Sequence, residues 1–421
     1  MATTAAVAPG AERSWGPRAL HALPAAVLLL ISVVVVGGRR GLPEVEPLII
    51  FADLSQVTYN SGCTAASAGE VGATECDPLG RPYNYPGIWA AAFRIAGVSG
   101  ADTELVGWTM VVLACVALAA VGVAVGRRPD WAGLVLATLA LSSPPMLLMA
   151  ERGNTDLVIV VLLSVAVLAA LSRRTWLLSA LVLALAAGLK LFPAGSILGL
   201  RRRVEWLVAG AMTAVAVAVL ALPDLRAIQA GTPSYNDVSF GAGVVPSVVR
   251  GDLAAAPGLT VEGRDQLLGL VCVALVLAVV LLVRGLRRRV LATAAAVAGD
   301  GLTRVLFMVG AGAFLTAYAL TTSFDYRLFT LVFVVLAGLR VRAGGPRVLA
   351  VWAVVSLWTS YWLPRSLEFV GDVGLIFFAG TLAAVVLVVV VGGLPGPAAR
   401  LGLHAAPPAA GAEPVRTEVR Q

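Results

Sequence analysis

Apolar runs of about 20 residues recur along the whole chain, and arginines close most of them. A run of that length can cross the hydrocarbon core of a bilayer as one helix. The pattern predicts an all-α polytopic membrane protein with about 12 crossings. Two of these are short half-helices between 175 and 200, and the other ten lie at 19–36, 104–125, 131–149, 156–171, 204–222, 266–283, 302–320, 328–339, 348–363 and 373–392.

The half-helix pair follows from the arginines on either side of it. The clusters at 173–174 and 201–203 belong on the same side of the membrane, and the stretch between them is too short for two full spans. Pro193 breaks a helix, so the chain is predicted to turn at Lys190-Leu191-Phe192-Pro193, with the apex lining a polar cavity. The alternative is one kinked span, with the second cluster on the other side.

The first long polar stretch, 44–93, interrupts this apolar pattern after the first span. Asp53 follows the apolar run 48–52, and the stretch closes on Arg81-Pro82-Tyr83-Asn84-Tyr85-Pro86. A short interfacial helix is predicted at 88–98. The stretch is therefore expected to form a loop over one end of the bundle.

Composition supports the same class. The chain is 59% hydrophobic and 13% charged, with a mean hydropathy of +0.90, which excludes an ordinary soluble globule. We expect disordered cytoplasmic tails at 1–17 and 395–421 around a membrane domain at 18–394.

The net charge of +7 arises from an uneven distribution of basic and acidic residues that indicates the topology of the protein in the membrane. Arginine clusters fall in alternate loops, and acids concentrate in the loops between them. This predicts a multi-pass protein of the cell membrane with both termini cytoplasmic and the Asp53 loop outside. Arg39 and Arg40 are the exception to this pattern. Nucleic acid is not an expected partner.

Two cysteines lie in the outer stretch, Cys63 and Cys76, with 12 residues between them. An oxidising location favours a disulfide between them, and two unpaired thiols are the alternative. No neighbouring residues complete a metal-ligand set, so no metal site is expected. Cys115 and Cys272 lie in apolar spans and are interpreted as core residues.

The two histidines, His21 and His404, lie at or beyond the predicted cytoplasmic end. Chemistry at the outer face must therefore use carboxylates, arginines and Lys190, the only lysine in the chain. A charge at membrane depth is costly and indicates a functional site. An ammonium there suits the phosphate of a lipid carrier, whereas the alternative is a lysine that snorkels from a helix end.

Two further polar clusters lie at predicted span edges. In the cluster 151–156, Asp156 or Asn154 can cap the next helix, and this role does not need Arg152 or Glu151. In the cluster 322–327, Arg327 either pairs with Asp325 or faces inward to bind phosphate.

Asp53 is the candidate general base, because a carboxylate in a partly dry site can accept a proton from a sugar hydroxyl. Glu44 and Glu46 are alternatives nearby. Asp77 precedes Pro78 and is interpreted as a turn residue.

Together these residues resemble a known family. The acid after the first span and the closing PYNYPGIW resemble the first outer loop of GT-C membrane glycosyltransferases. The motifs ERGNTDL, GLKLFP and SFDYRLF, in this order at span edges, resemble glycosyltransferase family 87 over roughly residues 20–390. The chain departs from the commoner pattern of that family in its insertion with Cys63 and Cys76 and in lacking the outer histidine that some members place near the acceptor.

The resemblance implies an inverting hexosyltransferase that moves a sugar, mannose by preference, from a polyprenyl-phosphate carrier to an extracytoplasmic glycolipid or glycan. Asp53 would be the catalytic base, and Lys190, Arg327 and Arg152 would bind the donor phosphate. The expected sugar or acceptor contacts are Tyr83, Tyr85, Trp89, Asn154, Asp156 and Tyr235.

For the aromatic residues among these, interfacial anchoring is the alternative role. A monomer that needs no metal or other cofactor is expected. A lipid or solute transporter, or flippase, is the rival function, and a non-catalytic membrane scaffold is a further one.

Overall fold

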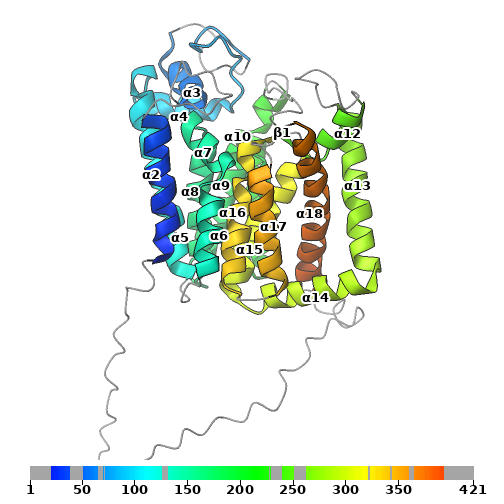
Figure 1. Cartoon of the computed structure of the whole chain (residues 1–421). Helices are drawn as coiled ribbons and strands as arrows, with labels where there is room; N and C mark the ends of the chain where they lie inside the picture. The colour runs from blue at the N-terminus through cyan, green and yellow to red at the C-terminus, as the bar shows by residue number, and fades with distance from the viewer. Residues whose placement is uncertain are drawn as a thin grey trace, which may run out of the picture.

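The computed structural model describes residues 20–37, 51–64, 70, 72–125, 131–226, 228, 239–250, 262–320, 323–341, 344–359 and 365–392. It is a bundle of roughly upright helices with a smaller helical cap at one end (Figure 1). The predicted tails 1–17 and 395–421 lie outside the described residues, as do the candidates Glu44, Glu46 and Tyr235.

The upright helices follow the apolar runs of the sequence. They are α2 (Leu23–Gly37, after the 3-10 turn η1, Leu20–Ala22), α5 (Thr103–Val125), α6 (Trp131–Leu141), α7 (Pro144–Arg152), α8 (Asp156–Ala170), α9 (Trp176–Leu189), α10 (Arg203–Leu220), α13 (Gly263–Leu282), α15 (Gly301–Leu320), α16 (Leu331–Leu339, after η5, Asp325–Thr330), α17 (Gly345–Thr359) and α18 (Arg365–Gly392).

Among the described residues, five helices are long and apolar enough to cross a membrane, or six if the bent pair α6 and α7 is one span. Five shorter apolar helices of 10–17 residues stand beside them. The protein is therefore a helical membrane protein. The count of 12 crossings and the GT-C-like arrangement stay predictions.

The bend between α6 and α7 is 41° and falls at Ser142 and Ser143. Pro144 and Pro145 begin α7, where a missing backbone N–H costs nothing. The expected single span at 131–149 is thus two helices. The second carries the chain to Arg152, at the capped end of the bundle (Figure 1).

The turn predicted at Lys190 to Pro193 is present. Helix α9 ends where Lys190 adopts an extended backbone, and the chain continues as a 3-10 helix, η3 (Phe192–Gly199). Arg173, before α9, and Arg201, after η3, line one cavity, so this segment returns to the end from which it started. Gly195 and Gly312 allow η3 to approach α15, since a Cβ on Gly195 would lie 2.2 Å from the Gly312 carbonyl oxygen.

One long helix was not expected from the sequence. Helix α14 (Arg284–Ala298) lies across the end of the bundle opposite the cap (Figure 1). Its arginines interrupt the apolar pattern and are exposed, whereas Val290, Thr293, Ala294 and Val297 form a buried stripe at helical spacing. The helix therefore packs one face on the bundle.

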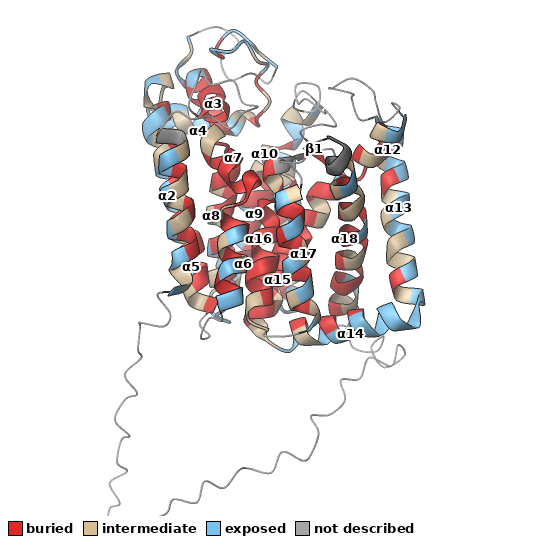
Figure 2. Cartoon of the chain, viewed as in Figure 1, coloured by how far each residue is buried: buried red, intermediate tan, exposed pale blue. Residues whose placement is uncertain are grey.

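Short elements complete the end that carries the cap. They are α12 (Val244–Arg250), η2 (Gly100–Asp102), η4 (Leu222–Asp224) and the two-residue strands β1 (Ser239–Phe240) and β2 (Ser323–Phe324), which pair antiparallel. The core lies around α15 and α16, which are buried along most of their length (Figure 2). The rings of Phe240 and Phe314 stack there with centroids 6.1 Å apart.

The cap consists of α3 (Ala52–Gly62), α4 (Gly87–Ile95) and the chain between them. Helix α4 overlaps the interfacial helix predicted at 88–98. Helix α3 was not predicted, because its buried residues include polar ones that bond to its own backbone, as when Ser55 Oγ donates to the Ala52 carbonyl. A disulfide joins Cys63 to Cys76 and closes the loop after α3.

Candidate active site

Asp53 lies in the first turn of α3 and is only 7% exposed. Two residues before it, Phe51 is fully buried and has a left-handed backbone with φ of 59°. Its N–H donates to the carbonyl of Glu151 over 3.1 Å, which ties the start of α3 to the end of α7. This contact brings the carboxylate of Asp53 to the corner between α7 and α8.

That corner supplies two partners for Asp53. Arg152 donates to Oδ1 from Nε over 2.9 Å and from Nη2 over 2.6 Å, and Asn154 donates to Oδ2 from Nδ2 over 2.7 Å. Gly153 lies between them with φ of 59°. A Cβ on this glycine would lie 2.8 Å from the Cβ of Phe51, so a glycine is required here.

Asn154 also explains how α8 begins. Its Oδ1 accepts a hydrogen bond from the N–H of Asp156 over 2.9 Å, so this side chain contacts the helix start and the Asp53 carboxylate at once. The N-cap residue of α8 is Thr155, which makes no side-chain cap bond, so neither of the two residues that the sequence offered as caps holds that position, and Asn154 contacts the helix start from one residue before it. The side chain of Asp156 does not cap the helix and is available for other contacts.

Asp156 is fully buried and pairs with two cations. Its Oδ1 lies 3.2 Å from Lys190 Nζ, and its Oδ2 lies 3.6 Å from Arg327 Nε. The predicted inward orientation of Arg327 is therefore the one observed. The side chain of Asp325, its alternative partner, lies outside the described residues.

Tyr85 connects the two groups. The centre of its ring lies 4.9 Å from Lys190 Nζ, and its hydroxyl lies 3.5 Å from Nδ2 of Asn154. Tyr83 and Trp89 lie nearby in a second apolar cluster with Val57 and Ala90. Both of these rings are buried, and their contact with a sugar stays a prediction.

Arg81 is the site residue that the sequence did not single out. Its Nε and Nη2 bind the two oxygens of Asp77 at 2.9 Å, Nη2 donates to the carbonyl of Ala52, and Nη1 lies 3.7 Å from Asp53 Oδ1. Asp77, interpreted as a turn residue, is thus the buried partner of Arg81. Its place in the closing segment Arg81–Pro86 was the available signal.

The charges around Asp53 change its acidity. Burial favours the neutral acid, but the Arg152 guanidinium, hydrogen bonds from Arg152 and Asn154, and Arg81 outweigh it and lower the pKa of Asp53. Burial, with the negative charge of Asp53, raises the pKa of the Tyr85 phenol, so that residue stays neutral. The site thus holds an ionised carboxylate beside a neutral hydroxyl.

The predicted residues Asp53, Arg152, Asn154, Asp156, Lys190, Arg327 and Tyr85 therefore converge from α3, the chain before α4, the α7–α8 corner, the α9–η3 turn and η5. Within the described part of the chain, no group of three His, Cys, Asp or Glu side chains is arranged to hold a metal ion. The arrangement holds two buried carboxylates, Asp53 beside Arg81 and Arg152 and Asp156 beside Lys190 and Arg327.

Comparison with known proteins finds a matching family. Residues 83–309, more than half of the chain, match the family model described as glycosyltransferase family 87. The matched segment includes Arg152, Asn154, Asp156 and Lys190, whereas Asp53 and Arg327 lie outside it. No curated protein and no solved structure matched the chain.

Proposed function

The chain belongs to glycosyltransferase family 87, and from this premise we propose that it transfers a sugar, mannose by preference, from a polyprenyl-phosphate carrier to an extracytoplasmic glycolipid or glycan. That it is a glycosyltransferase follows from the family. The donor, the sugar and the acceptor are the proposal. The observation that supports it most strongly is a buried charged cluster in which Asp53 pairs with Arg81 and Arg152, and Asp156 pairs with Lys190 and Arg327.

Asp53 acts as the base in this proposal, and its oxygens differ in what they can still accept. Oδ1 accepts two bonds from Arg152, whereas Oδ2 accepts one from Asn154 among the described residues. A carboxylate oxygen has two lone pairs, so Oδ2 keeps one for the hydroxyl of the acceptor. Arg152 and Asn154 fix the direction of that lone pair.

Lys190 and Arg327 receive the donor phosphate in the proposal. Both already lie against a carboxylate, Asp156, which holds the two cations in one place. A phosphate oxygen can bind to donors of these side chains that Asp156 does not use. Arg152 is the third phosphate ligand in the proposal, on the side of Asp53.

The reaction is a direct displacement with inversion. The acceptor oxygen forms a bond to the anomeric carbon while the bond from that carbon to the phosphate oxygen breaks. The hydroxyl proton passes to Asp53 Oδ2, and polyprenyl phosphate leaves with the bonding electron pair. Fixed cations at the leaving oxygen stabilise the charge that develops there.

The test measures transfer of labelled sugar from a polyprenyl-phosphate donor by membranes that contain equal amounts of each variant. We expect Asp53→Asn to lose at least about a hundredfold in rate, in the range of a missing general base. Glu104→Gln, an exposed acid at the start of α5, is the matched control and should transfer like the wild type.

Equal transfer by Asp53→Asn and wild type would exclude Asp53 as the base. If wild-type protein consumes no polyprenyl-phosphate sugar but moves a lipid or solute across the bilayer, the proposed donor and reaction are both wrong.

A further inference from the structure

A second charged site lies at the other end of the bundle. A cavity of about 110 Å³ opens between the end of α8, the start of α9 and the turn from η3 to α10. Helix α8 connects it to Asp156, and its 15 residues place the two ends about 22 Å apart. The cavity is therefore separate from the Asp53 site. A single buried water needs only roughly 10 to 15 Å³, so there is space for a larger group.

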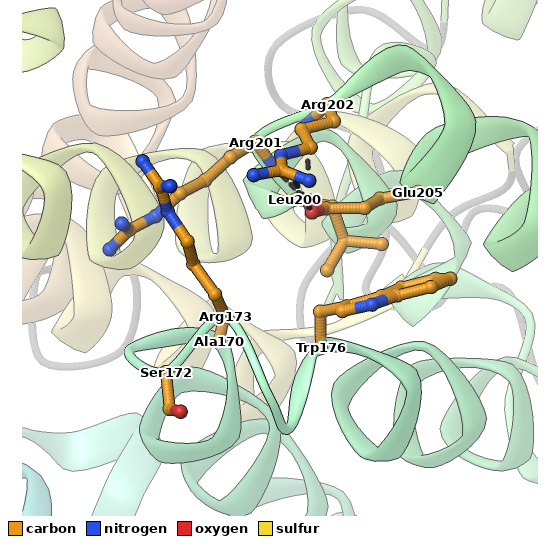
Figure 3. Close-up of a pocket in the computed structure, with 8 residues that line it drawn as sticks. All are labelled: Ala170, Ser172, Arg173, Trp176, Leu200, Arg201, Arg202 and Glu205. Atoms are coloured by element: carbon orange, nitrogen blue, oxygen red, sulfur yellow. Dashed lines mark hydrogen bonds and ion pairs between the residues drawn. The ribbon is translucent and has the colours of Figure 1, made fainter.

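The walls of the cavity are basic and aromatic. Arg173 and Arg201 extend toward the same side of it, and Trp176 forms part of the opposite wall (Figure 3). Among the lining residues, all within the described part of the chain, Glu205 is the only carboxylate. Its Oε2 is occupied by the N–H groups of Arg201 and Arg202, at 2.8 and 3.1 Å.

The guanidinium groups of Arg173 and Arg201 are not neutralised by the described residues. No described carboxylate lies within 4 Å of either one. Arg201 reaches over Gly301, the first residue of α15, where a Cβ would lie 2.8 Å from Nη2. The adjacent Asp300 carboxylate is bound by Arg340 and Thr303. The cavity therefore carries excess positive charge.

Two helix N-termini add to this charge. Helix α9 begins at Trp176 and helix α10 at Arg203, both beside the cavity, and backbone N–H groups at helix starts attract anions. Two arginines and two helix starts beside one cavity favour an anion, and arginine binds phosphate groups strongly.

The surroundings favour a lipid as the source of that phosphate. Helices α9 and α10 pack closely, since a Cβ on Gly188 would lie 2.9 Å from Leu220 Cδ1 and 3.0 Å from the Ala216 carbonyl oxygen, and both helices begin beside the cavity. Their outer faces expose apolar side chains that begin next to the cavity and continue away from it: Leu177, Leu178, Leu181, Leu185, Val204 and Leu207. Acyl chains can lie along this face while the headgroup enters the cavity.

We propose that this cavity binds the phosphate headgroup of an anionic membrane lipid, held by Arg173 and Arg201 with the acyl chains along α9 and α10. The site is independent of the transfer reaction. By binding Arg173 and Arg201 together, the headgroup joins the two ends of the half-helix pair, opposite the turn at Lys190.

The test uses the purified full chain in detergent and measures the midpoint of thermal unfolding while phosphatidylglycerol is titrated in. Phosphatidylcholine and inorganic phosphate are titrated separately. We expect phosphatidylglycerol alone to raise the midpoint. Arg173→Gln/Arg201→Gln should raise the half-saturating amount of phosphatidylglycerol at least about tenfold, since the variant removes both guanidinium groups that attract the anionic headgroup.

The matched control is Arg287→Gln/Arg288→Gln, which removes two exposed charges from α14 outside the cavity and should keep the wild-type response. Ser172→Glu leaves both arginines in place and adds a carboxylate at the cavity rim, so it should weaken the response even if the arginine variant unfolds. If the control variant loses as much of the response to phosphatidylglycerol as the cavity variant, the lipid binds through general surface charge and the proposed site is wrong. If inorganic phosphate raises the midpoint as much as phosphatidylglycerol does, the cavity binds free phosphate and the proposal of a lipid ligand is wrong.

Discussion

Arg152 binds a single oxygen of Asp53 with two of its nitrogens, Nε at 2.9 Å and Nη2 at 2.6 Å. The two residues are 99 positions apart, and the contact joins the cap to the bundle. It fixes the orientation of the carboxylate and leaves Oδ2 to Asn154 and, in the proposed reaction, to the acceptor hydroxyl. It also holds the carboxylate in its ionised form.

The first prediction concerns this ionisation. Arg152→Gln removes the positive charge, so burial dominates and the pKa of Asp53 rises from its lowered value. Since the base must be ionised, activity falls as pH drops through that pKa. The acid limb of kcat/KM against pH should therefore move to higher pH in the variant. Arg264→Gln, at an exposed ion pair on α13, should leave the limb in place. If the acid limb of kcat/KM does not move in Arg152→Gln, Arg152 does not control the ionisation of Asp53.

The second prediction concerns the disulfide. Cys63–Cys76 directly precedes Asp77, which holds Arg81 beside Asp53. Cys63→Ser/Cys76→Ser should lower stability by roughly 2 to 4 kcal/mol and reduce transfer, because this segment loses its anchor. Thermal unfolding and transfer rates test both effects.

The matched control for the disulfide is Cys272→Ser, which changes an exposed free thiol on α13. Reductant should affect the wild type and this control alike, and leave the double variant unchanged. A double variant with full transfer and stability would show that the disulfide has no part in positioning Arg81.

The spans were predictable because lipid requires an apolar run of sufficient length, whatever its periodicity. The same rule missed α14, whose arginines at 284 and 287–289 end the preceding run and whose buried stripe is narrow. It also missed α3, where buried residues such as Gln56 and Asn60 satisfy their polar groups on backbone carbonyls within the cap. Burial of this kind leaves no apolar pattern in the sequence.

The candidate site was predictable where a residue is unusual for its setting. Lys190 in an apolar segment, Arg152 and Asp156 at a span edge, and Asp53 after an apolar run each stand out from their neighbours. Arg81 does not stand out, since an arginine in a polar loop is ordinary. Its role depends on contacts with Asp77, Ala52 and Asp53 that only the folded chain creates.

The third prediction separates folding from donor binding in the buried ion group. Asp156→Asn leaves Lys190 and Arg327 facing each other without a carboxylate, which should cost about 3 to 5 kcal/mol of stability. Lys190→Met instead leaves Asp156 paired with Arg327, so it should fold better but show a raised KM for the donor. Thermal unfolding of both variants and donor kinetics of the second provide the test. Equal stability of the two variants would show that Asp156 does not balance both cations.

The last prediction concerns Gly153, whose backbone has φ of 59° and which packs against Phe51 and Leu54. A methyl group would lie 2.8 Å from the Cβ of Phe51 and 3.1 Å from that of Leu54, so Gly153→Ala must move α3 or the α7–α8 corner. Strain of this kind costs about 1 to 3 kcal/mol. Because Arg152 and Asn154 flank this glycine, the same movement separates both of them from Asp53, and transfer should fall with stability.

Gly210→Ala is the matched control for this variant. Gly210 lies within α10, and no described atom outside its chain neighbours and the backbone of its own helix lies within 4 Å of the position that a methyl group would take there. Alanine at this position should therefore leave transfer unchanged and stabilise the helix by roughly 0.5 to 1 kcal/mol. Thermal unfolding and transfer assays compare the two variants directly. If Gly153→Ala loses stability but transfers normally at a temperature where it is folded, the corner is a packing feature and the geometry of Asp53 does not depend on it. If Gly153→Ala loses both stability and transfer, the backbone conformation of Gly153 is needed to position Asp53.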